Sequence, residues 1–204
     1  MPPRSSNAIR APGAATVGLD RFYGHVLSRD AMTDDRLWPY PQLDVICAKG
    51  IAVTPDGRRF ADEGLGGICL TNAIAALDDP LSATAVFDST VWEDARATDN
   101  VPPNPSLPDN GGTVIEAGFH VPHPVARPPF YAVPLCAGLT VTSGGLAIDA
   151  QARVMDSEGE PIPGLYAAGS SAGGLEGGPQ VGYVGGLIKA FCLGLIAGDA
   201  IAAG

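Results

Sequence analysis

Apolar residues occur along the chain in short runs that end at Gly, Pro, Asn or Asp. In the first half, β-branched and aromatic runs predict strands, whereas apolar residues at helical spacing predict helices. The expected strands cover residues 16–25, 45–53 and 83–87, and the expected helices cover residues 68–77 and 89–97. Thr54-Pro-Asp-Gly57 predicts a turn that closes a hairpin, with Arg58 to Phe60 as its second strand. Asp88 or Ser89 is expected to cap the helix that follows.

The second half alternates apolar runs with turns. Runs at 130–136, 139–141, 146–148 and 152–155 are separated by Gly, Ser and Asp, and they predict a meander of short strands. Residues 101–129 are rich in proline and predict a connection between two lobes. Residues 1–13 lack the apolar stretch of a signal peptide and are expected to be a disordered lead-in.

The last third of the chain carries the most information. Ile162 to Ala168 predicts a strand, glycine-rich sequence runs from Gly169 to Gly186, and an apolar helix continues to Ala203. Many α/β proteins bind nucleotide cofactors with this arrangement, because glycines admit a ligand to the backbone and a helix start carries unpaired N–H groups. The alternative interpretation is a glycine-rich surface turn before a packing helix.

The C-terminal helix is apolar on every side, which is typical of a helix buried in a layered α/β domain. It is almost long enough to span a bilayer, but Lys189 lies in its middle, Asp199 lies near its end and no basic cluster flanks it. The pairs Gly182/Gly186 and Gly194/Gly198 would let the helix approach a sheet closely, although this spacing also occurs in membrane dimers. A buried helix is favoured over a membrane span.

The composition of the chain argues against some classes of function. The 204 residues include 12 Lys or Arg and 22 Asp or Glu, so the net charge of −10 argues against nucleic-acid binding. The four cysteines form no Cys-x-x-Cys pair, so we expect buried free thiols in a reducing, cytoplasmic compartment. His120-x-x-His123 has no third ligand nearby and a metal site is not expected.

Several motifs occur in a specific order. Phe22-Tyr-Gly-His25 and Gly50 to Glu63 come first, and Thr142 to Met155 and Ile162 to Gly169 follow; Gly173-Gly174 and a Gly/Ala-rich helix come last. In order and content they resemble the C-terminal part of the flavoprotein superfamily that includes fumarate reductase, the succinate dehydrogenase flavoprotein subunit and 3-ketosteroid dehydrogenases. The likeness covers residues 14–88 and 130–204.

The resemblance implies an FAD enzyme of the α/β class, α+β in part, in which hydride passes between flavin N5 and an activated C–C bond. It implies an incomplete FAD-binding domain at residues 14–57 and 130–204, a truncated capping lobe at 58–129, and a buried C-terminal helix. The family's N-terminal Gly-x-Gly-x-x-Gly unit, which holds the FAD pyrophosphate, does not occur in this sequence.

The resemblance also suggests which substrates fit. Fumarate reductases place an arginine where this chain reads Gly64 to Gly67, a histidine near Val141 and a second arginine near Gln180. Cationic groups for a dicarboxylate are therefore missing. We expect a small substrate that is uncharged or bears a carbonyl group.

Two residues are candidates for catalysis. His25 would hydrogen-bond substrate or shuttle a proton, and Tyr183 would polarise a carbonyl or donate a proton. The alternatives are a core histidine and an aromatic plug. Glu176 is a candidate partner for the ribityl chain, while Arg58 and Arg59 are expected to pair with Asp62 or Glu63. The expected cofactor-binding residues are Gly144, Gly145, Ala168, Gly169, Ser170, Gly173, Gly174, Gly185, Gly186 and Leu187.

Three functions remain open at this point. The first is part of an FAD-dependent oxidoreductase with a small-molecule substrate. The second is a catalytically inactive flavoprotein fragment that acts as a structural or interaction module. The third is a small ligand-binding protein without redox chemistry. A complementing chain or self-association is expected, because the face that the missing lobe would cover would expose apolar surface.

Overall fold

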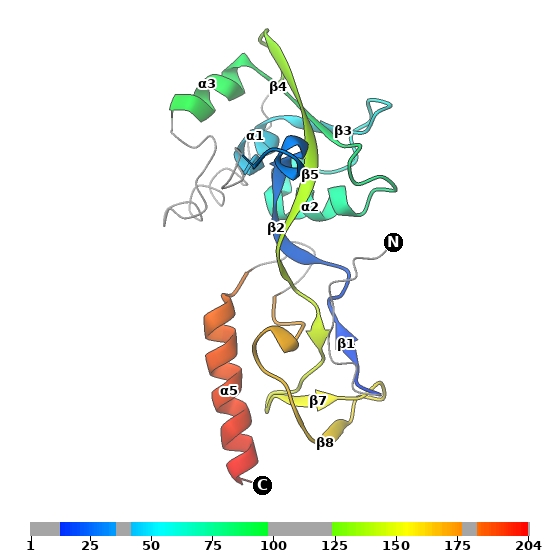
Figure 1. Ribbon diagram of the computed structural model, residues 1–204, viewed down its shortest axis with the longest axis vertical. Helices are drawn as coiled ribbons and strands as arrows, with labels where there is room; N and C mark the ends of the chain where they lie inside the picture. Colours follow the sequence, from blue (N-terminus) through cyan, green and yellow to red (C-terminus); the bar gives the residue numbers. More distant parts are fainter. Residues whose placement is uncertain (1–12, 36–41, 98–123, 177–182, 204) are drawn as a thin grey trace. The chain divides into compact units, whose positions relative to one another are not determined.

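The computed structural model describes residues 13–35, 42–97, 124–176 and 183–203 (Figure 1). The chain forms two compact units, of which the first comprises Met1–Tyr23 and Val141–Gly204 and the second comprises Gly24–Thr140. The sequence-based division into an FAD-binding part and a capping lobe has other bounds, and it stays a prediction.

The second unit contains most of a four-stranded sheet. Its strands are β2 (Phe22–Ser28), β3 (Ile51–Val53), β4 (Thr84–Asp88) and β5 (Phe130–Thr142), in the order β2-β5-β4-β3. β4 is antiparallel to both neighbours, so that Val86 lies opposite Ile51 on one side and Ala132 on the other. The helices are α1 (Asp44–Lys49), α2 (Gly67–Ala75) and α3 (Ser89–Ala97), with 3-10 turns η1 (Arg29–Met32) and η3 (Glu63–Leu65).

The core of the second unit is apolar and well filled. Phe87, Leu70, Ile74 and Leu135 are almost completely buried, and the Phe87 ring stacks on Tyr131 with centroids 5.4 Å apart. Burying one side chain of this size contributes about 1.5–3 kcal/mol. The core therefore fixes the two elements, β2 and α1, that hold the candidate site.

Several predicted elements are confirmed. The helix expected at 68–77 is α2, the strand expected at 83–87 is β4, and the helix expected at 89–97 is α3. Asp88 caps α3, because its Oδ1 accepts hydrogen bonds from Thr90 N at 3.0 Å and Val91 N at 3.2 Å.

Three predictions in the first half were wrong. The strand expected at 16–25 is divided into β1 (Thr16–Val17) and the start of β2 (Phe22–Ser28). Residues 44–49 form helix α1, and only Ile51–Val53 forms a strand. A short apolar run does not distinguish a strand from a buried helical turn, and α1 is buried because it packs against α2, α3 and β4. The turn at Thr54 to Gly57 is present, but the second hairpin strand is reduced to one bridge between Val53 and Arg59.

The first unit is built from short elements. β1 (Thr16–Val17) pairs antiparallel with β6 (Gly145–Leu146), and β7 (Arg153–Met155) pairs antiparallel with β8 (Pro161–Tyr166). A 3-10 turn, η4 (Gly169–Ser171), and a helix, α5 (Gly186–Ala203), follow. Their small core includes Leu146, Val154, Ala172, Leu193 and Ala197.

The predicted meander is only partly correct. Residues 130–142 form one continuous strand, β5, where two short strands were expected. Gly138 does not interrupt it. A Cβ atom at Gly138 would lie 2.6 Å from Leu27 Cδ1, so this glycine lets β2 approach β5.

The C-terminal helix is not buried, contrary to expectation. Only Lys189, Leu193 and Ala197 of its 18 residues are buried. The outer face exposes Leu187, Phe191, Leu195 and Ile201, and a Cβ atom at Gly194 or Gly198 would have no neighbour within 4 Å. At Gly194 and Gly198 the expected close approach to a sheet is therefore not seen among the described residues.

α5 is also long and apolar enough to cross a membrane, judged by length and composition alone. Its inner face, however, packs against η4 and the core of the first unit. A helix held in this way would have to take the whole unit into the bilayer, where the unit's loops would lose their hydrogen bonds to water. This packing argues against a membrane span, and the sequence-based preference against such a span stays a prediction.

The thiol prediction needs one correction. All four cysteines are free, and Cys47 and Cys136 are buried as expected. Cys69 is half-buried and Cys192, on α5, is exposed. The apolar sequence around Cys192 reflects the exposed apolar surface of α5 and not a core position.

Candidate functional site

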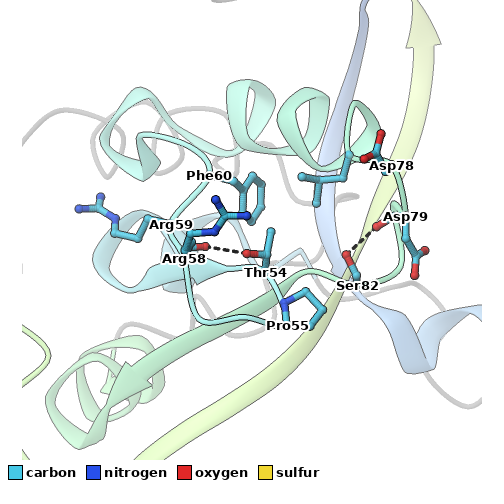
Figure 2. A pocket seen from close by; sticks show the side chains of 9 residues that line it. Thr54, Pro55, Arg58, Arg59, Phe60, Asp78, Asp79 and Ser82 are labelled. Carbon is cyan, nitrogen blue, oxygen red and sulfur yellow. Dashed lines mark hydrogen bonds between the residues drawn. The ribbon is translucent and has the colours of Figure 1, made fainter.

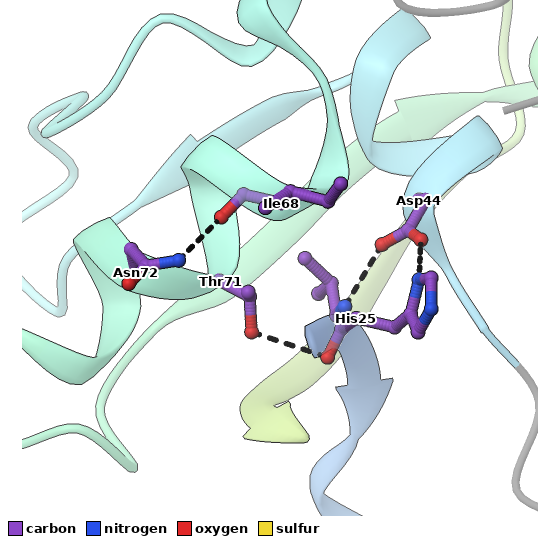
Figure 3. A network of polar contacts seen from close by, with 6 residues as sticks. His25, Asp44, Ile68, Thr71 and Asn72 are labelled. Atoms are coloured by element: carbon purple, nitrogen blue, oxygen red, sulfur yellow. Dashed lines mark hydrogen bonds and ion pairs between the residues drawn. The ribbon is translucent and has the colours of Figure 1, made fainter. Parts of the chain in front are cut away.

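His25 and Asp44 form a polar pair in the second unit, in which His25 is half-buried and Asp44 is buried (Figure 3). His25 lies on β2, and Asp44 is the first residue of α1. The His25 Nδ1 and Asp44 Oδ2 atoms are 2.6 Å apart, and the two side chains are 14% and 2% exposed. The second carboxylate oxygen, Oδ1, accepts a hydrogen bond from Val26 N at 2.8 Å.

Helix α2 supports this pair from a second direction. The Thr71 hydroxyl donates to the backbone oxygen of His25 at 3.1 Å (Figure 3). A Cβ atom at Gly67, the first residue of α2, would lie 2.1 Å from Asp44 Cγ. The carboxylate therefore sits against a helix start, where the helix dipole and unpaired N–H groups favour a negative charge.

Tyr183, in the first unit, is held by two contacts. Its ring stacks on Tyr23 with centroids 4.7 Å apart, and its hydroxyl oxygen accepts a hydrogen bond from Gly186 N at 2.8 Å. The side chain is 44% exposed. A phenol that accepts one hydrogen bond still has its O–H to donate. The proposed role in proton donation stays a prediction.

Two predicted cofactor glycines, Gly145 and Gly173, lie in close backbone contact with each other in the first unit. A Cβ atom at Gly145 would lie 2.6 Å from Gly173 N, and one at Gly173 would lie 2.4 Å from Gly145 N. Gly173 N donates to Leu146 O at 3.0 Å. At Gly144, a Cβ atom would lie 2.7 Å from the Leu19 Cα atom. These three glycines are therefore required by the unit's own backbone contacts, and any cofactor contact stays a prediction.

The other predicted cofactor residues fall into two groups. Gly169, Gly174 and Gly185 have φ angles of 60°, 81° and 97°, in the left-handed region that favours glycine. Ala168 and Gly186 are half-buried, whereas Ser170 and Leu187 are exposed.

Two buried polar atoms next to these glycines have no partner among the described residues. They are Ser143 Oγ, just before Gly144, and Glu176 Oε1, just after the Gly173-Gly174 pair. The other Glu176 oxygen accepts a hydrogen bond from Lys189 Nζ at 3.1 Å. Buried polar groups are normally paired, so unpaired ones at a glycine-rich segment are compatible with a bound polar ligand.

Sequence reasoning missed three of these residues. Asp44 gave no signal, because nothing in the sequence links it to a histidine nineteen positions away. Ser143 could have been found as a hydroxyl residue directly before a glycine pair. Lys189 could also have been found, since a lone cation in an apolar helix needs an acidic partner when it is buried.

The cavity in Figure 2 lies elsewhere, in the second unit. Its volume is about 540 Å³, and its lining includes Thr54, Phe60, Leu77 and Asp79. None of the predicted site residues lines it.

The two arginines that line this cavity, Arg58 and Arg59, are already paired. Arg59 forms an ion pair with Glu63, as predicted, whereas Arg58 pairs with Asp56 across 2.5 Å instead of with Asp62 or Glu63. Within the described ranges, no three metal-ligating side chains cluster together. His120 and His123 lie outside the described residues.

Comparisons with known proteins give consistent relatives. A family model described as an FAD binding domain matches residues 46–182. NADH:acrylate oxidoreductase from Vibrio harveyi is 47% identical over 75 residues, which are 37% of this chain and 7% of that protein. 4-oxocyclohexanecarboxylate 2-dehydrogenase from Sinomonas cyclohexanicum is 38% identical over 114 residues, 54% of this chain and 16% of that protein. Fumarate reductases from Shewanella frigidimarina are further relatives.

A solved structure shares the fold. It is 3-ketosteroid delta1-dehydrogenase from Sterolibacterium denitrificans, with a TM-score of 0.59 and 18% identity over 94% of this chain and 45% of that chain. The matched residues of this chain span at most 30% of the length of the three curated relatives named above. The resemblance that the motifs predicted is confirmed.

Proposed function

The chain belongs to the FAD binding domain family, and from that premise we propose that it forms part of an FAD-dependent oxidoreductase. The family and its flavoprotein relatives indicate FAD as the cofactor. When bound, the flavin would supply hydride transfer at N5 to or from an activated C–C bond. The family match over residues 46–182 is the observation that carries this proposal.

The residues of the first unit fit a polar cofactor in part. Ser143 Oγ and Glu176 Oε1 are buried without a partner in the described chain, and both adjoin the predicted cofactor glycines. They would hold polar atoms of the cofactor, which would satisfy groups that otherwise lower stability. Burial of both side chains would also keep water from competing for these contacts.

The residues available for proton transfer are His25 and Tyr183. The ring of His25 is oriented by a buried carboxylate, and the Tyr183 hydroxyl accepts one hydrogen bond while keeping its proton. Each group is of a type that serves as general acid or base when its geometry is fixed.

A small substrate with a carbonyl group fits this chain best. The name of the Sinomonas relative specifies an oxo acid, and the solved dehydrogenase is in complex with a dione. At Val141, Gln180 and Gly64 to Gly67 the sequence lacks the cations that the resemblance predicts for a dicarboxylate site. These observations favour a carbonyl-activated substrate over fumarate or succinate.

The rest of the FAD site would come from a segment with a Gly-x-Gly-x-x-Gly motif, in the same polypeptide or in another. The 204 residues contain no such motif, and the likeness to the solved dehydrogenase covers only 45% of that chain. The exposed apolar face of α5 supports this part of the proposal, because such a face is stabilised when it is covered.

Flavin retention tests the proposal. The protein, with the motif-bearing segment present, is expected to be isolated yellow, and the spectrum measures the bound fraction. Ser143→Ala should lower that fraction by about tenfold, as expected for one lost polar contact. Ser157→Ala, at an exposed serine of the same unit outside the predicted cofactor residues, is the matched control and should retain the flavin. A colourless wild type that takes up no added FAD would refute the proposal.

The second candidate is an interaction module without catalysis. The specific observation that favours it is the outer face of α5, where Leu187 and Phe191 are 77% and 73% exposed. A module of this kind would associate through that face whether or not FAD is bound. Association without flavin retention would select this candidate over the oxidoreductase.

A further inference from the structure

We propose that Asp44 is a positioning residue that fixes His25 in the tautomer with its proton on Nδ1, so that Nε2 carries the lone pair. The 2.6 Å contact between His25 Nδ1 and Asp44 Oδ2 is the observation that points to this role. The importance of the tautomer for turnover rests on the proposed function, whereas the tautomer itself does not.

The donors and acceptors on the two side chains determine which group donates in this contact. An ionised carboxylate can only accept, so the histidine nitrogen facing it must donate a proton. The surroundings of Asp44 suit an acceptor: Val26 N donates to Oδ1 at 2.8 Å, and the start of helix α2 lies beside the carboxylate.

The carboxylate cannot easily turn away from the ring. Oδ1 is engaged by the backbone of Val26, and the side chain is 2% exposed. Gly67 fits against the carboxylate only because it has no Cβ atom. The ring is therefore positioned by a group that is itself fixed on three sides, as a precise site requires.

The chemical consequence concerns Nε2. In the dehydrogenation direction, Nε2 would accept the proton that leaves a substrate C–H bond, while a bound flavin would supply the hydride acceptor. The Asp44 carboxylate beside Nδ1 would stabilise the imidazolium that results. In the reductive direction, the same proton returns from Nε2 to the substrate carbon.

The substitution Asp44→Asn tests the assignment without any cofactor. The amide has the same shape, its Oδ1 can still accept from Val26 N, and its Nδ2 can only donate to His25 Nδ1. We expect the ring to change to the tautomer with its proton on Nε2. The chain has three histidines, so His25→Gln identifies the resonances of His25 by their loss.

Nitrogen-15 NMR of histidine-labelled protein at about pH 9, where an unperturbed imidazole is neutral, reads the tautomer directly. The wild type should show protonated Nδ1 and Asp44→Asn should show protonated Nε2. Asp88→Asn is the matched control, because Asp88 is also buried but accepts only backbone N–H groups. A wild-type ring protonated on Nε2 would overturn the proposal even if no variant folds, and so would an unchanged ring in folded Asp44→Asn.

Turnover separates the positioning role from the proposed function. In the flavin-loaded enzyme, Asp44→Asn should lower kcat by about 100-fold or more with a smaller effect on KM, as expected for a misplaced general base. An NMR tautomer change with unaltered kcat would refute the catalytic use of His25 and leave the tautomer assignment standing. A wild type without any turnover would instead count against the proposed function.

Discussion

Lys189 donates a hydrogen bond to Glu176 across 3.1 Å, and each of the two side chains is 3% exposed. The lysine lies in an otherwise apolar stretch of α5, and it faces the first unit and not solvent. Removing water from both charges is costly, and their mutual attraction offsets part of that cost.

Breaking this pair should therefore be more damaging than replacing it. Lys189→Met would leave Glu176 buried and unpaired, and it should lower the free energy of unfolding by about 3–5 kcal/mol. The double variant Lys189→Met/Glu176→Leu should be close to wild type, because no charge is left uncompensated. Urea unfolding of both variants measures the difference. A double variant as unstable as the single one would contradict the interpretation.

Asp88 should contribute to stability in a pH-dependent way. Its Oδ2 accepts hydrogen bonds from Arg127 N and Ala126 N, both at 2.9 Å. These bonds, with the bond from Arg127 foremost, lower the pKa of Asp88 to about 2. Because the pKa in the folded state is depressed, the stabilisation is present above the unfolded value of about 3.9 and is lost as pH falls through about 2.

The corresponding variant is Asp88→Asn. It should be less stable than wild type at pH 6, and the gap should close between about pH 4 and pH 2. Thermal unfolding at a series of pH values measures the gap. A gap that stays constant across this window would show that the carboxylate's ionisation is not the source of the stabilisation.

The cysteines should differ sharply in reactivity. Burial raises the pKa of the Cys47 thiol well above its usual range, and the negative charges of Asp44 and Glu63 raise it further. Cys192 is exposed on α5. Because the thiolate is the reactive form, a disulfide reagent at about pH 8 should modify Cys192 first and Cys47 only after unfolding. Loss of the fast phase in Cys192→Ser checks this, whereas loss of that phase in Cys47→Ser would contradict it.

Two glycine-to-alanine substitutions should have opposite effects on the stability of the protein. Gly173→Ala would place a Cβ atom 2.4 Å from Gly145 N, a backbone atom that cannot yield easily, so a loss of at least about 1–3 kcal/mol is expected. Gly194→Ala meets nothing within 4 Å and should stabilise α5 by about 0.5–1 kcal/mol. The melting temperatures of the two variants test both signs. A higher melting temperature for Gly173→Ala than for wild type would contradict the close backbone contact between Gly173 and Gly145.

Periodicity and capping were sufficient for part of the fold. α2, β4 and α3 follow from helical spacing, β-branched content and an aspartate cap, which are local signals. α1 was missed because six apolar-rich residues carry no period, and burial by neighbouring elements decided their conformation. β5 was divided at Gly138 because the sequence does not show that Leu27 needs the space of the absent side chain.

The candidate site was predictable to a smaller degree. His25 was found through a motif, but its partner Asp44 depends on a long-range contact that the sequence pattern does not contain. The glycine-rich segments were found from composition. The close backbone contact between Gly145 and Gly173 was not predicted, since only the folded backbone shows which glycines lie against each other.

The orientation of α5 has a practical consequence for protein engineering. Its anchoring residues, Lys189, Leu193 and Ala197, face inward, whereas Phe191 and Leu195 face outward. Hydrophilic replacements at the outer positions would improve solubility without disturbing the anchors. Substitutions on the inner face of α5 would therefore change the stability of the unit. Substitutions on its outer face would change the tendency of the unit to associate with other molecules.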